Sequence, residues 1–282
     1  MVVPILTYGA EIWGYQLYKS IETVQNKFCK KLLGVKQATP NCATLGEFGR
    51  LPLHIIYMTK CIKYWLKLLS MDKDRYPNRC YEMLYAHHNV GRVNWATKIR
   101  DMLYNYGFKY VWSYQQVGNS DNFLSMFKQR VIDCNIQEWH SAIKTCSKLD
   151  FYAEIKSLLE PEKYLSTIIN KQHRVDLSRL RVSSHNFAIE SGRAMSIERN
   201  DRICEYCLNE RHISTIENEL HILVHCQLYD NLRTICNVNN YCKSEIHVKG
   251  YLQSTNCDII CNISKFIYNA MKRRENYLSK LK

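Results

Sequence analysis

The sequence predicts a mainly α-helical protein, on two observations. Apolar residues recur at intervals of three and four along most of the 282 residues, whereas the sustained period-two alternation typical of half-buried strands is hard to find. Hydrophobic residues make up 46% of the chain, which is enough to form a buried core and argues against disorder. We therefore expect amphipathic helices that pack on one another through their apolar faces.

The first part of the chain is expected to be helical around one connector. Over residues 1–36, Ile21, Val24 and Phe28 share one face, and lysines occupy positions between them. Residues 37–52 contain two prolines and two glycines and are predicted to be a connector. Residues 53–70 follow a strongly amphipathic pattern whose apolar stripe is expected to face the core. Residues 71–80 are then predicted to be a loop.

Further helical patterns occupy most of the remaining sequence, over residues 94–112, 121–145, 151–159 and 164–181. A polar, cysteine-bearing stretch follows over residues 237–256, and a last helical pattern covers residues 259–282. Neither an internal repeat nor a low-complexity run is present. Because no repeat is present, the sequence does not indicate which helices pack against one another.

The charge of the chain points to a polyanionic partner. Its 39 lysines and arginines outnumber 26 acidic residues and give a formal net charge of +13. Nucleic acid is the first candidate for such a partner and an anionic membrane surface is the second. The alternative is a basic surface that binds nothing.

An intracellular location, nuclear or cytoplasmic, is expected. No window approaches the roughly 18 uninterrupted apolar residues of a membrane span, and the apolar N-terminus lacks the basic lead and cleavage site of a signal peptide. The 13 cysteines are odd in number and spread along the chain, which favours free thiols and one metal site over a disulfide framework.

A cysteine-histidine cluster lies in RICEYCLNERHISTIENELHILVHC, residues 202–226. Cys204 and Cys207 are spaced so that both thiolates reach one Zn²⁺ from a single turn, and His221 and Cys226 complete a set of four ligands. His225 is the alternative fourth ligand. The interval between the ligand pairs contains no aromatic residue of the kind a DNA-reading finger needs for its small core, which favours Cys226. The competing interpretation is that these side chains are unrelated, with Cys226 in the core and His221 near Glu217.

Basic residues gather just before this cluster. The stretch LSRLRVSSHNFAIESGR places Arg179, Arg181, His185 and Arg193 near a Ser-Ser pair and a glycine, an arrangement suited to phosphate contacts by guanidinium groups. The alternative is a solvated face in which Glu190 pairs with one of the arginines.

A second basic cluster lies in the last helical pattern. It contains Lys272, Arg273 and Arg274, followed by Lys280 and Lys282, with Tyr268 and Tyr277 nearby to stack on bases. The alternative is a charged terminal helix that only keeps the chain in solution.

Two regions of the chain resemble a known family. The strings YGAEIW, IETVQNKFCKKLLGV and TPNCATLGEFGRLPL resemble the region just after the polymerase palm in LINE-type (non-LTR) retrotransposon reverse transcriptases, where the thumb begins and a helical extension follows. The strings LSRLRVSSHNFAIESGRAMSIERNDRICEYC and ENELHILVHCQLYDNLR resemble the C-terminal segment of the same polyproteins. The matches cover about residues 4–53 and 177–233, and the middle of the chain is similar only in being helical.

The resemblance implies a domain organisation and a fold. Residues 1–50 would be a thumb remnant with its connector, and residues 51–176 a helical extension. Residues 177–236 would be the arginine-rich segment with a CCHC zinc knuckle, and residues 237–282 a linker with a basic C-terminal helix. The expected fold is thus a helical thumb and extension with a small zinc-stabilised knuckle.

The resemblance also implies site residues and partners. The knuckle ligands of the family fall on Cys204, Cys207, His221 and Cys226, which would hold one structural Zn²⁺. The segment before the knuckle includes Arg202 beside the arginines named above. In the family this end of the protein is thought to bind template RNA and target DNA during target-primed reverse transcription. We therefore expect RNA or DNA as partners, bound largely through phosphate, and also the rest of a reverse transcriptase polyprotein.

Polymerase chemistry is not expected of this chain. The palm motif of the family ends in adjacent aspartates that hold metal ions, and this sequence contains no Asp-Asp and begins beyond the place where the motif would lie. After Cys226 only four acidic residues occur, too scattered for a nuclease site. The competing hypotheses are a protein-interaction scaffold or degenerate fragment without a nucleic-acid role, and residual polymerase or nuclease activity.

Overall fold

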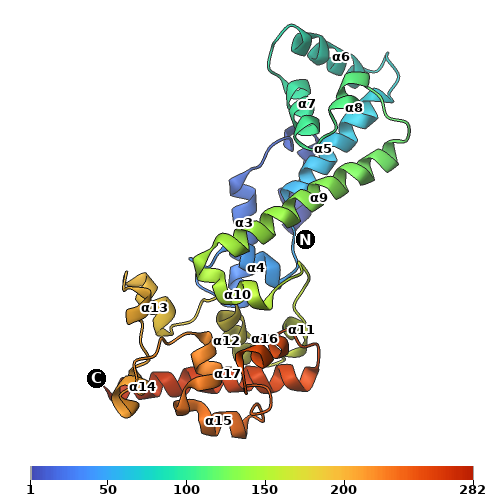
Figure 1. Ribbon diagram of the computed structural model, residues 1–282. Helices are drawn as coiled ribbons and strands as arrows, with labels where there is room; N and C mark the ends of the chain where they lie inside the picture. The colour runs from blue at the N-terminus through green and yellow to red at the C-terminus, as the bar shows by residue number, and fades with distance from the viewer. Residues whose placement is uncertain (1, 282) are drawn as a thin grey trace. The chain divides into compact units, whose positions relative to one another are not determined.

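The computed structural model describes residues 2–281, and these residues are all-helical, with no strand among them (Figure 1). The prediction of a mainly α protein is therefore confirmed. Lys282, predicted as part of the basic tail, and Met1 lie outside the described residues. No helix within residues 2–281 combines the length and the apolar character needed to cross a membrane.

The chain forms two compact units, each built from two separate segments. The first unit comprises Met1–Gln25 and Leu51–Glu138, and the second comprises Asn26–Arg50 and Trp139–Lys282. The boundaries fall within α3 (Lys19–Leu33), at the end of the connector, and within α9 (Ser120–Thr145). These units do not coincide with the four predicted segments, because residues 1–50 and 51–176 are each divided between the two units.

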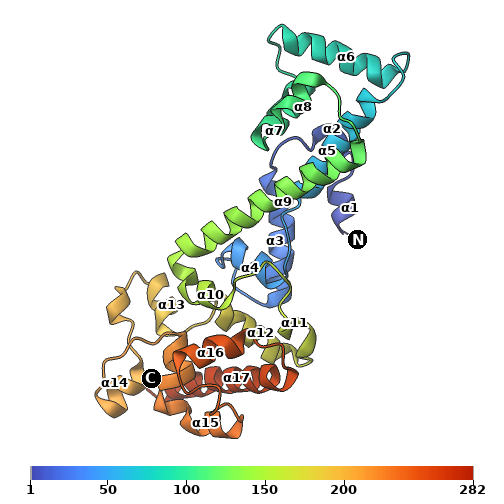
Figure 2. The ribbon, with the colours of Figure 1, turned by 45° about the vertical axis from the view of Figure 1, so that its right-hand side comes forward.

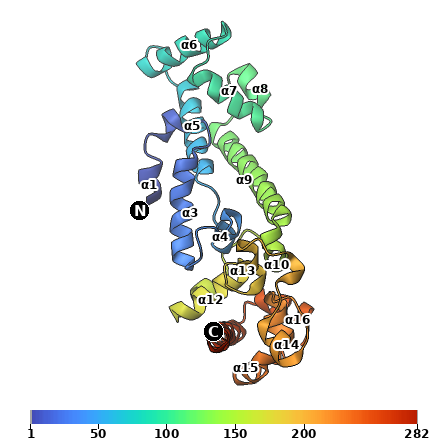
Figure 3. The same ribbon diagram turned by 90° about the vertical axis from the view of Figure 1, so that its left-hand side faces the viewer.

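The first unit packs its helices around α5 (His54–Leu69), as Figure 3 shows. It also contains α1 (Val2–Leu6), α2 (Ala10–Trp13), α6 (Tyr76–Asn89), α7 (Trp95–Asn105) and α8 (Lys109–Tyr114). The apolar stripe of α5 is buried as predicted, with Trp65 and Ile62 fully inside the core beside Ile99 and Phe127.

Three predictions for residues 1–112 were wrong in detail. Residues 71–80 are not a loop throughout, because α6 begins at Tyr76; Pro77 sits in its first turn, where a missing N–H costs no hydrogen bond. The predicted helix over residues 94–112 is broken at Gly107, whose φ of +85° ends α7 before α8 begins. The initial pattern over residues 1–36 is likewise divided into α1, α2 and α3.

The second unit is centred on α12 (Lys171–Arg181) and α17 (Cys257–Lys280), which lie side by side (Figure 2). Around them lie α4 (Asn41–Glu47), η1 (Ser147–Leu149), α10 (Asp150–Ile155), α11 (Tyr164–Thr167), α13 (Ala188–Ala194), η2 (Arg199–Asp201), α14 (Glu205–Arg211), η3 (His221–His225), η4 (Gln227–Tyr229), α15 (Asp230–Ile235) and α16 (Glu245–Leu252). The connector over residues 37–52 thus carries a helix, and so does the polar stretch over residues 237–256.

A buried ion network joins α4, α11 and α12. The guanidinium of Arg181 contacts Glu47 at 2.9 Å through Nε and Glu162 at 2.9 Å through Nη2, and it donates to the carbonyl of Leu252 at 2.7 Å. The phenol of Tyr164 donates to Glu47 at 2.6 Å, and Lys156 pairs with Glu162. Two carboxylates therefore face two cations inside the protein, which leaves the network without net charge.

Candidate metal centre

Four side chains converge in the second unit. The sulfurs of Cys204, Cys207 and Cys226 and a ring nitrogen of His221 all lie within 4.8 Å of one another, and all four residues are buried. The sulfur of Cys226 lies 3.9 Å from that of Cys204 and 3.8 Å from that of Cys207. Zinc bound tetrahedrally, with Zn–S distances of about 2.3 Å, separates its sulfurs by about 3.8 Å. The group can therefore hold one metal ion.

Local backbone structure brings the first two ligands together. Cys204 is the extended residue just before α14, and Cys207 lies in its first turn. The amide of Cys204 donates to the carbonyl of Thr215 at 2.8 Å, and the amide of Ile213 donates to that of Cys207 at 3.0 Å. The chain therefore returns past the cysteine pair, and α14 is too short to be stable without such contacts.

The second pair depends on an unusual turn. The amide of Cys226 donates to the carbonyl of His221, five residues earlier, at 2.8 Å, which makes η3 a π-helical turn. In a regular α-helix, residues five apart point about 140° away from each other, whereas residues four apart share a face. The wider π turn thus turns Cys226 toward the cluster, and the alternative ligand His225 lies outside it, with its ring 3.5 Å from Glu245.

The three thiols share their charge unequally. The hydrogen bond with Cys226 lowers the pKa of the Cys204 thiol to about 4, whereas burial raises the pKa of Cys207 to about 11. The same hydrogen bond, together with burial, raises the pKa of Cys226. The thiols of Cys207 and Cys226 therefore have raised pKa values, and a divalent cation has to displace their protons to gain them as thiolate ligands.

A buried arginine that the sequence did not single out supports the π turn. Arg233, in α15, is 5% exposed, and its guanidinium donates to the carbonyls of Leu223 at 2.9 Å, Ile222 at 3.0 Å and Cys226 at 3.1 Å. The carbonyls of Ile222 and Leu223 belong to the π turn, and the carbonyl of Cys226 follows it and also accepts from the amide of Tyr229 at 3.2 Å. In the sequence, only its position seven residues after Cys226 indicates that Arg233 could lie near the metal ligands.

Glu217 and Glu219, which lie in the sequence between Cys207 and His221, bind the neighbouring segment of residues 183–188. Glu217 accepts hydrogen bonds from the amide of Ala188 at 2.6 Å and from Arg274 at 2.7 and 2.6 Å. Glu219 accepts from the hydroxyl of Ser183 at 3.0 Å and lies 2.9 Å from the ring of His185. Because both glutamates are buried, the loop that carries the metal ligands also positions residues 183–188 and α17.

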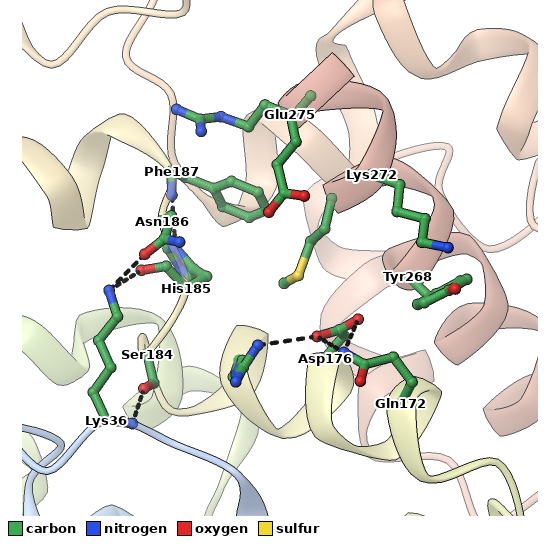
Figure 4. Close-up of a pocket in the computed structure, with 13 residues that line it drawn as sticks. Lys36, Gln172, Asp176, Ser184, His185, Asn186, Phe187, Tyr268, Lys272 and Glu275 are labelled. Atoms are coloured by element: carbon green, nitrogen blue, oxygen red, sulfur yellow. Dashed lines mark hydrogen bonds and ion pairs between the residues drawn. The ribbon is translucent and has the colours of Figure 1, made fainter. Parts of the chain in front are cut away.

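Beside this loop lies a pocket of about 440 Å³, which brings together Arg179, His185, Lys272 and Arg274 from the predicted set (Figure 4). Lys36 joins them: its ammonium donates to the carbonyl of His185 at 3.0 Å and to Asn186 at 2.7 Å. On the wall opposite Lys36, the ammonium of Lys272 lies 4.4 Å from the ring centre of Tyr268 (Figure 4). Lys36 was not predicted from the sequence, because it lies 135 residues before the start of α12.

Two of the predicted nucleic-acid contacts are buried among protein partners. Arg181 is 1% exposed and belongs to the buried ion network, so no phosphate can reach it. His185 is 3% exposed, and both of its ring nitrogens have protein partners, Glu219 and the amide of Phe187. The burial of these residues could not be predicted from the sequence, because their carboxylate partners, Glu47 and Glu219, lie far from them in the chain.

The remaining arginines of the set are partly engaged within the protein. Arg193 pairs with Glu190 at 3.1 Å, as the alternative interpretation anticipated for one arginine. Arg202 donates to the carbonyls of Ile197 and Ile189, and Arg274 is held by Glu217. Lys272, by contrast, is exposed, and the side chain of Arg179 is 40% exposed. The most accessible cations of the pocket are therefore Lys36, Arg179 and Lys272.

Comparison with protein-family models, curated proteins and solved structures found no match to this chain. The resemblance to LINE-type reverse transcriptases therefore stays a prediction.

Proposed function

We propose that this chain is a zinc-containing, nucleic-acid-binding C-terminal part of a LINE-type reverse transcriptase, with template RNA or target DNA as its partner. The observation that supports this most directly is the buried Cys₃His group beside a pocket with exposed cations. The proposed role is to bind and orient nucleic acid, without a polymerase or nuclease step.

The ligand chemistry favours zinc. Three thiolates and one imidazole suit a borderline-soft cation in tetrahedral geometry, whereas magnesium and calcium require oxygen ligands. Four protein ligands leave no open position for a substrate or water, so the ion has a structural role. The helices within residues 203–229 are short, seven residues at most, and metal binding would supply the folding free energy that such small elements lack.

The charge distribution favours a phosphate backbone. The whole chain carries a formal charge of +13, and Lys36, Arg179 and Lys272 present ammonium and guanidinium groups to one pocket. Asp176 lines the same pocket, but it is buried, burial raises the pKa of its carboxyl, and Gln172 and Arg179 contact it. Its negative charge is therefore largely compensated within the protein. Tyr268 adds an aromatic face on which a base can stack.

Metal analysis together with binding at two salt concentrations tests the proposal. We expect one zinc per chain in the purified protein and none in Cys204→Ser, with Cys80→Ser, an exposed thiol of the first unit, as the matched control. Three phosphate contacts on a single strand predict a roughly 20-fold loss of affinity between about 50 and 200 mM salt. Fluorescence anisotropy with single-stranded RNA measures this loss.

Two results would contradict the proposal. A chain that purifies without zinc and binds nucleic acid with no salt dependence would exclude both parts of it. A protein partner that co-purifies after nuclease treatment, with no nucleic acid bound, would instead favour the interaction scaffold.

A further inference from the structure

A groove lies beside the pocket described above, on a neighbouring face of α17. It encloses about 490 Å³ between α17 and the η4–α15 segment that follows the metal ligand Cys226. Its walls carry Lys272, Arg273 and Lys280, and none of the described lining residues is acidic. The groove is therefore more purely cationic than the pocket beside α12, whose lining includes Asp176 and Glu275.

The three cations are spread along the groove. Lys272 and Lys280 are exposed, and their separation of eight positions corresponds to about 12 Å along the helix axis. Arg273 lies between them, and one of its terminal nitrogens donates to the carbonyl of Leu228 at 3.2 Å, which orients the guanidinium and leaves other donors free. Cations spaced in this way suit a run of neighbouring phosphates better than a single anion.

The remaining lining suits unpaired bases. Leu228 and Leu232 form an apolar floor, and Tyr277 adds an aromatic ring. That ring is held edge-on against Tyr206 at 5.4 Å between ring centres, and its hydroxyl lies 3.3 Å from Glu210. In a duplex the base faces are stacked inside the helix, so an apolar and aromatic floor next to cations favours a single strand.

The groove and the pocket meet at Lys272, which lines both. Residues 268, 271 and 275 of α17 face the pocket, whereas residues 269, 273 and 276 face the groove. At about 100° per residue these two sets lie on adjacent faces of the helix, with Lys272 on the edge between them. A strand bound in the pocket can therefore continue into the groove by crossing α17 at this residue.

We propose that the groove between α15 and α17 is a second binding site for single-stranded nucleic acid, occupied by the continuation of the strand that the pocket holds. This inference rests on the proposed function and extends it to a path. Phosphates of the strand contact Lys272, Arg273 and Lys280, and bases lie against Leu228, Leu232 and Tyr277.

Removing charge from the groove tests the proposed path of the strand, in the whole 282-residue chain. The double variant Arg273→Gln/Lys280→Gln keeps a side-chain donor for Leu228 at position 273 and leaves the shared Lys272 in place. Lys144→Gln/Lys243→Gln removes the same charge from exposed positions of the second unit outside both cavities. Labelled oligouridylate, oligothymidylate and a mixed-sequence DNA duplex are titrated by fluorescence anisotropy over a range of salt concentrations, with zinc content as the check on folding.

We expect the groove variant to bind single strands several-fold more weakly, with a salt slope lower by about 1.4, at about 0.7 per counterion released. The control variant is expected to keep the slope of the parent chain. The arms with RNA and DNA show which single strand is preferred.

Each contrary result has a separate meaning. If the groove variant binds like the parent while Lys36→Gln/Arg179→Gln weakens binding, the groove inference is wrong and the proposed function stands. Equal weakening by the control variant, or an equal effect on the duplex, would also overturn the inference. If the zinc-loaded parent binds no nucleic acid at all, the proposed function itself fails.

Discussion

Replacing Arg181 with methionine distinguishes a structural arginine from a nucleic-acid contact. The substitution keeps much of the side-chain volume but removes the guanidinium that faces Glu47 and Glu162. The carboxylate of Glu47 is fully buried and Glu162 is only 17% exposed, so their charges would lie close together in the interior with one cation, Lys156, which pairs with Glu162. The carbonyl of Leu252 would also lose its donor.

The expected loss of stability follows from these contacts. Removing one partner of a buried ion pair costs about 3–5 kcal/mol, because the other charge stays buried without compensation. A total of about 4 kcal/mol is a large part of the 5–15 kcal/mol typical of a folded domain. Glu47→Gln is expected to cost less, about 1–2 kcal/mol, since Arg181 keeps Glu162 and the amide still accepts from Tyr164. The double variant should be less destabilised than the sum of the single variants, by about 1–3 kcal/mol.

Urea unfolding followed by far-UV circular dichroism measures the three stabilities at one zinc concentration. Nucleic-acid affinity is measured in parallel on the folded fraction, with Arg179→Met as the matched arginine of the same helix. We expect Arg181→Met to lower the unfolding midpoint and to leave the affinity of the folded protein unchanged. A variant with parental stability and weakened binding would refute the reasoning and return Arg181 to the binding surface.

Three further predictions concern the metal centre and the packing around it. Zinc affinity should fall as pH is lowered, by about one log unit per pH unit for each displaced proton. The reason is that the pKa of Cys207 is raised to about 11, so its thiol must lose a proton to bind zinc. A zinc affinity that does not change with pH, measured by competition with a chromophoric chelator, would contradict this. Arg233→Met should weaken zinc binding about 10- to 100-fold in the same assay, since it removes the donors that hold the π turn, whereas parental affinity would mean that the turn holds without them. Gly46→Ala should cost about 1–3 kcal/mol of unfolding free energy, because its Cβ would lie 2.5 Å from the Tyr152 hydroxyl, whereas Gly250→Ala, with open space around it, should not destabilise the protein.

Most of the helices could be predicted because their apolar faces repeat within a few residues. The pattern in α5 and the last helix is local, so it survives in the sequence as a readable period. The helix α6 was missed because its start, YPNRC, follows a charged loop and contains a proline, which reads as a break unless the first turn is known. The break at Gly107 was missed for the opposite reason, because both flanking segments have helical patterns and only the backbone conformation separates them.

The candidate site was predictable only in part. Spacing was sufficient to identify Cys204 and Cys207 as a pair, because both ligands lie within one turn and need no distant partner. Spacing alone did not decide between Cys226 and His225. In a regular helix His225, four residues after His221, would share its face, whereas the missing aromatic residue favoured Cys226. The choice depends on a π turn that Arg233 supports from another helix.

The sequence by itself therefore determined the helical class, the excess of positive charge and the residues from which a metal site is built. Only the tertiary structure decided which basic residues are available to a ligand. Arg179 and Arg181 stand two positions apart in the same helix, yet one reaches the pocket and the other is buried against a glutamate more than 130 residues away. Burial and ion pairing depend on which segments meet in space, and contacts between residues so far apart leave no period or spacing in the sequence.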